Sequence, residues 1–198
     1  MNARRQLARL YGDRHGYEDL PTEERAVRDA GSDAMYGELM PSATERLFAY
    51  LELSKRDVFY DLGSGIGKVV LHAALALPLR RAVGIEMVPR RHDLAVEVLD
   101  QIDARGLLQT ETCELWCGDF MRLPISDATV IYTCSTAFPD ALMSRLARRV
   151  ARLPKLRCFV SLREPEVLHG LEIVDVLNLD ASWRRNSKAF VYQPRKKR

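Results

Sequence analysis

Residues 57–86 read DVFYDLGSGIGKVVLHAALALPLRRAVGIE, and this stretch decides the fold. Its first part, 58–62, is a short run rich in β-forming apolar residues, and three glycines follow within five positions. From Lys68 the sequence is almost continuously apolar until Pro78 stops it, which is typical of a buried helix. A second apolar run, 81–85, ends at an acid. The order predicts a strand, a tight glycine turn, a helix and a second strand, a βαβ unit.

The glycine turn allows a ligand to approach the backbone closely, so the question is which ligand it accepts. A dinucleotide fingerprint needs G-x-G-x-x-G/A, but the sixth place counted from Gly63 is Lys68. A Walker phosphate loop needs G-x-x-x-x-G-K-[S/T], whereas Leu62 stands in the first place and Val69 follows the lysine. The pattern therefore disfavours both NAD and ATP.

Acids flank the turn on both sides. Asp61 directly precedes it, and Glu86 ends the second predicted strand twenty-five residues later. A carboxylate at the tip of the second strand suits the two hydroxyls of a ribose, while Asp61 suits a cationic ammonium beside the turn. Together with a later Gly118-Asp119-Phe120 turn, this combination resembles the class I S-adenosylmethionine (SAM) methyltransferases. An α/β turn that binds no ligand is the alternative interpretation.

A more specific resemblance covers residues 35–193. Tyr36-Gly37-Glu38, a helix over 43–51, the DLGSG turn and then VGIE resemble the non-SET histone-lysine methyltransferases of the disruptor-of-telomeric-silencing (Dot-one) family. The resemblance implies an α/β fold with a single Rossmann-like seven-stranded class I methyltransferase sheet, mostly parallel with an antiparallel final strand. It also implies S-adenosylmethionine as the cofactor, S-adenosylhomocysteine as the product, and methyl transfer to a lysine side-chain amine of a protein.

The same resemblance implies the cofactor-binding residues. In the family the YGE loop and the DLGSG turn line the SAM pocket, the acid after the second strand holds the ribose, and the Gly-Asp-Phe turn holds the adenine. For Asp119 a plain surface turn is the alternative. The implied set is Tyr36, Glu38, Asp61, Gly63, Ser64, Gly65, Gly67, Glu86, Asp119, Phe120 and Thr133.

The catalytic edge departs from the family pattern. A fourth strand is predicted over 128–133, and the residues just past such a strand face the ligand in an open α/β sheet. Here they read Cys134-Ser135-Thr136-Ala137-Phe138, where the family has Asn-Asn-Phe-x-Phe. Both amides are replaced, and it stays open whether Thr133, Ser135 or Thr136 takes the place of the amide carbonyl. The segment also lacks the [D/N]-P-P-[Y/F] pattern of enzymes that methylate the amino groups of DNA and RNA bases.

The resemblance extends to the last hairpin, where Trp183 and Tyr192 match family residues that shape the lysine channel. A core position is the alternative for Trp183. The candidate catalytic residues are Phe138, Trp183 and Tyr192, which match the family, and Ser135 and Thr136 of the altered segment. The altered segment keeps two other functions open: a methyltransferase that acts on a small molecule or RNA, and a SAM-binding module that has lost catalysis.

Composition bounds the remaining questions. A chain of 198 residues with 47% hydrophobic residues fits one globular domain, which we divide into a helical extension over 1–35, a methyltransferase domain over 36–194 and a basic tail over 195–198. The extension is expected to pack over the domain as a lid or dimer contact, or to dock only loosely. A helix start is expected at 21–24.

Net charge is only +3, with positive charge concentrated near the C-terminus. The basic tail is consistent with a weak nucleic-acid contact, a nuclear address or a solvated end. A protein associated with nucleic acid is one candidate substrate. No segment is apolar enough to span a bilayer, so we expect a soluble protein with no membrane partner, cytoplasmic or, in a eukaryote, nuclear. Cys113 and Cys117 lack a second ligand pair, so no metal is expected. The oligomeric state is left open.

Overall fold

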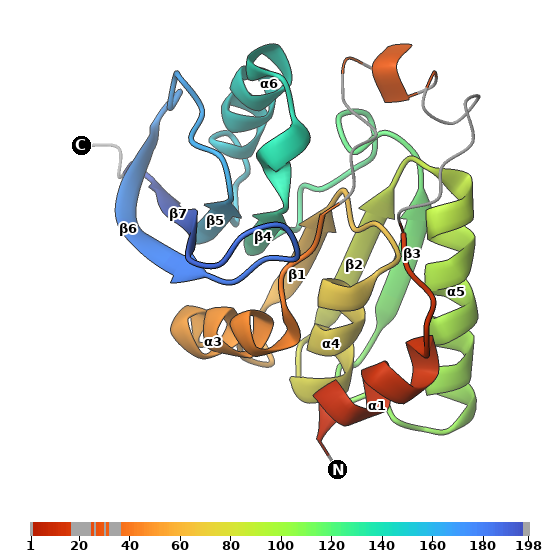
Figure 1. Cartoon of the computed structure of the whole chain (residues 1–198). Coiled ribbons are helices and arrows are strands. Elements are labelled where there is room, and N and C mark those ends of the chain that lie inside the picture. Colours follow the sequence, from red (N-terminus) through yellow and green to blue (C-terminus); the bar gives the residue numbers. More distant parts are fainter. Residues whose placement is uncertain (1, 17–24, 26, 30, 32–36, 196–198) are drawn as a thin grey trace.

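One seven-stranded sheet organises the chain, with the strand order β3-β2-β1-β4-β5-β7-β6 (Figure 1). The computed structural model describes residues 2–16, 25, 27–29, 31 and 37–195. All pairings from β3 through β5 are parallel, and β7 is antiparallel to both of its neighbours. The expected fold class is confirmed. The strands are β1 Val58–Leu62, β2 Arg81–Glu86, β3 Cys113–Cys117, β4 Val130–Thr133, β5 Cys158–Ser161, β6 Leu171–Leu179 and β7 Ser187–Pro194.

Helices cover both faces of this sheet (Figure 1). On one face α1, α3, α4 and α5 share a core with side chains such as Phe59, and on the other face α6 packs over side chains such as Tyr60. Phe59 and Tyr60 are neighbours in β1, so the alternation of a strand divides the core into two layers. The helices are α1 Ala3–Tyr11, α3 Pro41–Leu51, α4 Lys68–Ala76, α5 Pro89–Ala104 and α6 Asp140–Val150, with a 3₁₀ helix, η1, at Ser135–Ala137.

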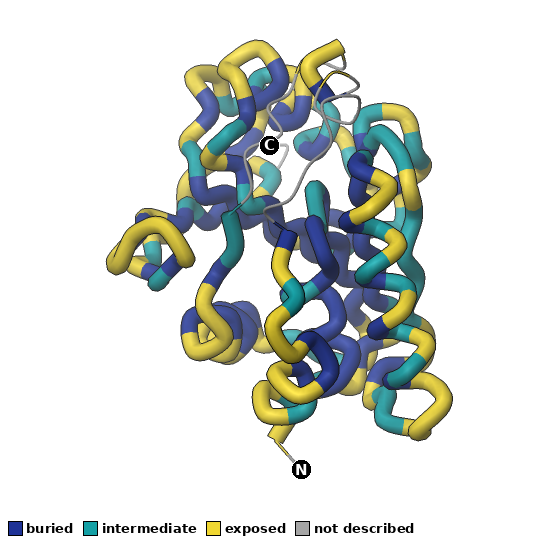
Figure 2. The backbone as a smooth tube through the Cα atoms, turned by 45° about the vertical axis from the view of Figure 1, so that its right-hand side comes forward, coloured by how far each residue is buried: buried dark blue, intermediate teal, exposed yellow. Residues whose placement is uncertain are grey.

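The central strands are buried on both faces, as continuous apolar runs require. All five residues of β1 and all four of β4 are buried. Figure 2 shows the contrast with outer helices such as α5, whose exposed residues alternate with buried ones. Among the described residues no helix has both the length and the apolar character needed to cross a bilayer.

The first helix belongs to the core rather than to a loose arm. Leu7, Leu10 and Tyr11 of α1 are buried in the same cluster as α4 and α5. The Tyr11 hydroxyl donates a hydrogen bond to the carbonyl of Ile66, just before α4. The expected helix start at 21–24 lies outside the described residues.

The strand order creates a crevice at the carboxyl ends of the central strands, where β1 lies next to β4. The chain runs from β1 to β2 on one side through α4, and later returns to place β4 on the other side of β1. Ligands of open α/β sheets bind outside the carboxyl ends of the strands at such a switch point. The candidate site is found there.

Candidate functional site

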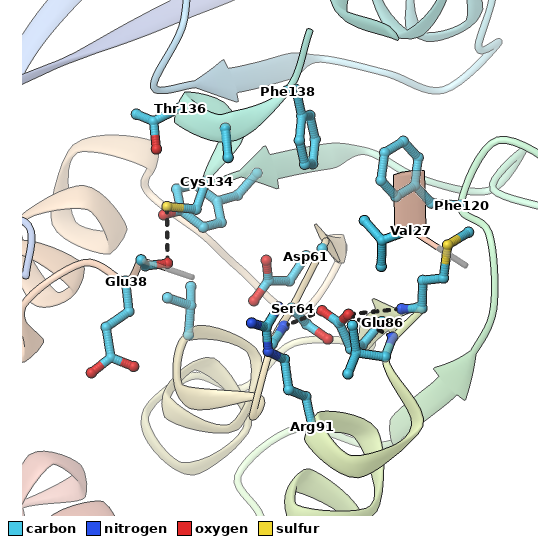
Figure 3. Close-up of a pocket in the computed structure, with 18 of the residues that line it drawn as sticks. Val27, Glu38, Asp61, Ser64, Glu86, Arg91, Phe120, Cys134, Thr136 and Phe138 are labelled. Atoms are coloured by element: carbon cyan, nitrogen blue, oxygen red, sulfur yellow. Dashed lines mark hydrogen bonds between the residues drawn. The ribbon is translucent and has the colours of Figure 1, made fainter. Parts of the chain in front are cut away.

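A cavity of about 270 Å³ opens at the carboxyl ends of β1, β2 and β4 (Figure 3). Its lining combines acids from two neighbouring strands with aromatic side chains from later loops. Tyr36 lies outside the described residues. The residues implied by the sequence that the structure brings to the lining are Glu38, Asp61, Gly63, Ser64, Gly65, Glu86, Asp119, Phe120, Thr136, Phe138 and Trp183.

Glycine is required at two places in the turn after β1. Gly63 has φ +74°, and a Cβ there would lie 3.3 Å from the Phe138 ring, so a side chain would be strained and would press on the cavity wall. Gly67 has φ +82°, and its Cβ would lie 2.9 Å from the Cβ of Ala95 in α5. Gly67 therefore does not line the cavity but permits the close packing of α4 against α5.

Glu86 holds the cavity floor together. Its carboxylate accepts hydrogen bonds from the backbone N–H groups of Gly65 at 2.7 Å, Met87 at 2.9 Å and Val88 at 2.8 Å. Burial raises the pKa of Glu86, although these bonds and the charge of Arg91 oppose that shift. A carboxylate has about four lone-pair positions, so one is left for a ligand hydroxyl.

Asp61 lies at the centre of the cavity (Figure 3). Its side chain is buried, and no ion pair to it occurs in the described part of the chain. Burial first, and then the nearby charge of Glu86, raise the pKa of Asp61 to about 8. A cation placed against this carboxylate would stabilise its charged form, so the site is suited to an ammonium or sulfonium group.

One wall of the cavity joins two segments far apart in the chain. The backbone N–H of Ser182 donates to the carbonyl of Glu38 at 2.8 Å, and the N–H of Glu38 donates to the Ser182 hydroxyl at 3.2 Å. An isolated antiparallel bridge joins Leu39 to Ala181 alongside. Figure 1 shows the loop between β6 and β7 reaching the segment before α3. Residues 37–40 and 180–183 thus form a single wall.

Trp183 completes this wall. A Cβ at Gly37 would lie 2.5 Å from two carbons of the Trp183 ring, so only glycine lets the ring lie this close. At this wall the Lys68 ammonium lies 2.6 Å from a carboxylate oxygen of Glu38 and 5.6 Å from the centre of the Tyr11 ring, and both Lys68 and Glu38 line the cavity. The ion pair of Lys68 and Glu38 therefore lies at this end of the cavity.

Two phenylalanines form the opposite wall. The rings of Phe120 and Phe138 are stacked with centroids 5.5 Å apart and planes at 30°. Before them, the Asp119 carboxylate accepts a hydrogen bond from the backbone N–H of Met121 at 2.7 Å, which orders the turn. The arrangement offers a flat apolar surface beside an acid.

Three further residues implied by the sequence are not part of the lining. The Thr133 hydroxyl donates to the carbonyl of Leu62 at 2.8 Å and so joins β4 to β1. The Ser135 hydroxyl lies 2.6 Å from that of Ser161. Tyr192 is fully buried on the α6 face of the sheet, where its neighbour in β5, Phe159, fixes its position.

Ser135 belongs to a clamp at the end of β5. Its hydroxyl accepts a hydrogen bond from the backbone N–H of Arg163 at 3.1 Å. The Arg163 guanidinium in turn donates to the carbonyl of Phe138 at 2.7 Å and pairs with Asp140. The clamp positions η1 and the start of α6, which carry Thr136 and Phe138 into the cavity.

The lining also contains residues that the sequence analysis did not single out as site residues, although it placed Gly37 and the segment 134–138 next to the ligand. The Cys134 thiol donates to the carbonyl of Gly37 at 3.2 Å, and burial raises the pKa of that thiol to about 12. Arg91 reaches the cavity from the first turn of α5 and donates to the carbonyl of Gly16 at 3.0 Å. The position of Arg91 just past Glu86 was a usable signal. The other lining residues outside the candidate set are Val27, Gly37, Lys68, Val69, Met87, Val88, Tyr132, Ala137 and Leu142.

Metal ligation has no support in the described ranges, where no group of three or more His, Cys, Asp or Glu residues could hold an ion. The chemistry of the site is that of buried carboxylates next to aromatic surface. Such a site can bind a ligand that carries both a cation and a flat ring.

Comparison with known sequences identifies relatives of this chain. A family profile described as "Histone methylation protein DOT1" matches residues 22–169. A histone-lysine N-methyltransferase of Drosophila melanogaster, H3 lysine-79 specific, is 32% identical over 130 residues, which are 62% of this chain and 7% of that protein. A protein-lysine N-methyltransferase of Saccharolobus islandicus is 33% identical over 112 residues, 57% of this chain and 56% of that protein. The matches therefore span only part of these relatives.

Comparison with solved structures supports the fold. An RNA methyltransferase from Salinibacter ruber, in complex with S-adenosyl-L-homocysteine, superposes with a TM-score of 0.60 at 20% identity. The match covers 80% of this chain and 94% of that one. At this identity the likeness establishes the Rossmann-like methyltransferase fold alone.

Proposed function

The chain belongs to the family of histone methylation protein DOT1, and from this premise we propose that it transfers a methyl group from S-adenosylmethionine to a lysine side-chain amine of a protein. The observation that carries the proposal is the juxtaposition, in one cavity, of two buried acids from neighbouring strands with a stacked aromatic pair. Asp61 and Glu86 supply the acids, and Phe120 and Phe138 the rings.

The residues present fit the cofactor. Asp61, which has no ion pair among the described residues, would hold the cationic end, and the free lone-pair position of Glu86 would accept a ribose hydroxyl. Asp119 and Phe120 offer an acceptor and a flat surface for the adenine. When bound, the sulfonium supplies a methyl group that is already electrophilic, so no acid/base pair is required of the protein.

The contribution of the chain is to align a neutral amine and to exclude water. A free lysine has a pKa of about 10.4 and is protonated at neutral pH. Apolar side chains around the amine disfavour its charged form and so lower its pKa. Phe138, Leu142 and Trp183 line the cavity and provide such surroundings, and Thr136 supplies a hydroxyl nearby.

The choice of protein substrate is a separate matter. The Drosophila relative is specific for H3 lysine-79 and the Saccharolobus relative carries the broader name of a protein-lysine methyltransferase. We extend to this chain only what these names share, which is a protein lysine. Exposed Arg195 begins the basic tail, and contact of this tail with nucleic acid belongs to the proposal as a weak accessory interaction.

Two experiments together test the proposal. Calorimetric titration of SAM compares the wild type with Glu86→Gln. In this variant the side-chain NH₂ group would face a backbone N–H group that now donates to the Glu86 carboxylate, so two donors would oppose each other. Incubation with methyl-labelled SAM then follows label into the protein, RNA and small-molecule fractions of a cell lysate. Glu111→Gln, an exposed change in the loop before β3, is the matched control.

We expect SAM binding that Glu86→Gln weakens at least about tenfold and Glu111→Gln leaves unchanged, with label on protein. Label on RNA or on a small molecule would refute lysine as the acceptor and favour a methyltransferase that acts on RNA or on a small molecule. Binding without any transfer would favour a SAM-binding module. No SAM binding by the folded wild type would refute the proposed use of the cavity.

A further inference from the structure

The loop that joins β6 to β7 brings positive charge to the cavity mouth. Residues 182–186, here called the hairpin tip, are all exposed. Trp183 lines the cavity although it is 43% exposed, so its ring is shared between the site and the surface. Arg184 and Arg185 follow it directly, and neither forms an ion pair within the part of the chain that the structure describes.

The backbone of the hairpin tip is held in place. Ala181 and Arg184 exchange backbone hydrogen bonds at 2.9 and 3.3 Å, and the Ser187 hydroxyl donates to the carbonyl of Arg184 at 3.1 Å. The N–H of Asn186 donates to the carboxylate of Asp180 at 2.9 Å. Because residues 180–183 are also bonded to the segment before α3, the tip has a fixed position beside the cavity.

The charge of this rim fits an acidic partner. Guanidinium groups pair well with carboxylates and are common at interfaces. The acid nearest in the chain, Asp180, already accepts a backbone hydrogen bond. Exposed Met40, whose N–H donates to the carbonyl of Asp180 at 2.9 Å, adds apolar surface at the start of this loop.

We propose that the hairpin tip is a docking surface for an acidic protein segment whose carboxylates flank the target lysine. Trp183 covers the lysine stem at the cavity mouth, and Arg184 and Arg185 pair with the flanking carboxylates. The Cα of Arg185 lies at most about 7.6 Å from that of Trp183, so carboxylates one or two residues from the lysine are within reach. This inference rests on the proposed lysine methyl transfer and specifies its substrate.

The test uses the full chain with S-adenosylhomocysteine present and three fluorescent peptides that share a central lysine. Glutamates flank the lysine in the first, serines in the second and arginines in the third. Fluorescence anisotropy measures binding, and mass spectrometry, with SAM in place of S-adenosylhomocysteine, measures transfer. We expect the glutamate peptide to bind about fivefold to tenfold more tightly than the serine peptide at low salt, and this preference to shrink at high salt.

Two double variants separate a local effect from one of net charge. Arg184→Glu with Arg185→Glu should reverse the preference in favour of the arginine peptide. Arg145→Glu with Arg148→Glu makes the same charge change on the exposed face of α6 and should leave the preference intact. Because all four arginines are exposed, we expect both variants to fold, and thermal unfolding checks this.

The outcomes distinguish this inference from the proposed function. Equal loss of preference in both double variants, or tighter binding of the arginine peptide by the wild type, overturns the docking surface. Transfer to all three peptides at equal efficiency also overturns it and leaves lysine methylation standing. Preferential binding of the glutamate peptide without transfer would show that the tip binds acidic segments but would overturn its role in presenting a target lysine, and it would count against lysine methylation by this chain.

Discussion

Replacing Asp61 by asparagine should reduce the number of protons that the protein releases when it binds SAM. Asp61 is buried in the centre of the cavity, and its pKa in the cofactor-free protein is raised to about 8 by burial and by the charge of Glu86. At pH 7 the carboxyl group is therefore about 90% protonated. A cationic ligand favours the ionised form, so binding must expel that proton.

The size of the effect follows from this pKa. Wild-type protein should release about 0.9 proton more than Asp61→Asn when SAM binds at pH 7. The wild-type affinity should rise about tenfold from pH 6 to pH 7 and level off above a pH of about 8, whereas the affinity of Asp61→Asn should lack this rise. The α-amino group of the ligand titrates in the same range, but it is common to both proteins and cancels in the difference.

The same pKa carries a consequence for stability. Because the folded-state pKa of Asp61 lies above its ordinary value of 3.8, the native protein holds a proton that the unfolded chain has lost between pH 4 and pH 8. The free energy of unfolding of the cofactor-free wild type should therefore fall, relative to Asp61→Asn, as pH rises through this window. The upper limit of the difference is about 5 kcal/mol, which water entry into the cavity reduces.

Calorimetry in buffers with different heats of ionisation gives the number of protons released, and denaturant titrations at several pH values give the unfolding free energies. Asp100→Asn, on the exposed face of α5, removes one carboxylate without touching the cavity and should behave as the wild type. Equal proton release by wild type and Asp61→Asn, or a wild-type affinity that does not change between pH 6 and pH 8, would refute the reasoning.

Two further variants probe the walls of the cavity. Gly63→Ala should weaken SAM binding about tenfold and lower the unfolding free energy by about 1–2 kcal/mol, because the new Cβ is strained and lies 3.3 Å from the Phe138 ring. Gly106→Ala, also at positive φ but with open space around the Cβ, should lose stability alone; equal weakening of SAM binding would contradict this account. Arg163→Ala should lower the unfolding free energy by about 1–2 kcal/mol, since it removes hydrogen bonds to the Phe138 carbonyl and to Asp140. It should also lower the rate of methyl transfer. Unchanged steady-state kinetics in Arg163→Ala would show that the clamp does not position the catalytic edge.

Local sequence signals were enough to predict the first βαβ unit and the cavity floor, whereas the complete seven-stranded sheet was inferred from the family resemblance. The glycine turn, the apolar run before it and the acid at the end of β2 are each readable within a few residues, and their geometry follows from strand and turn rules. Asp61 and Glu86 therefore lie where the sequence indicates.

Contacts between distant segments were not predictable in this way. The backbone of Glu38 is bonded to Ser182 across 144 positions of the chain, and no periodic pattern encodes the pairing of two loops. Tyr192 depends on strand register, because a shift of one residue moves a side chain to the other face of the sheet. The Ser135 hydroxyl could have faced the cavity or β5, and its choice depends on Ser161 and Arg163, which a linear pattern does not connect to it.

The most direct test of the central claim is the identity of the atom that receives the methyl group. Wild-type protein is incubated with methyl-labelled SAM and the protein fraction of a cell lysate, and the labelled peptides are sequenced by mass spectrometry. The expected result is label on lysine side-chain nitrogens, lost in Glu86→Gln. Label confined to other side chains, to RNA or to small molecules, despite SAM binding by the wild type, would contradict protein-lysine methylation by this chain.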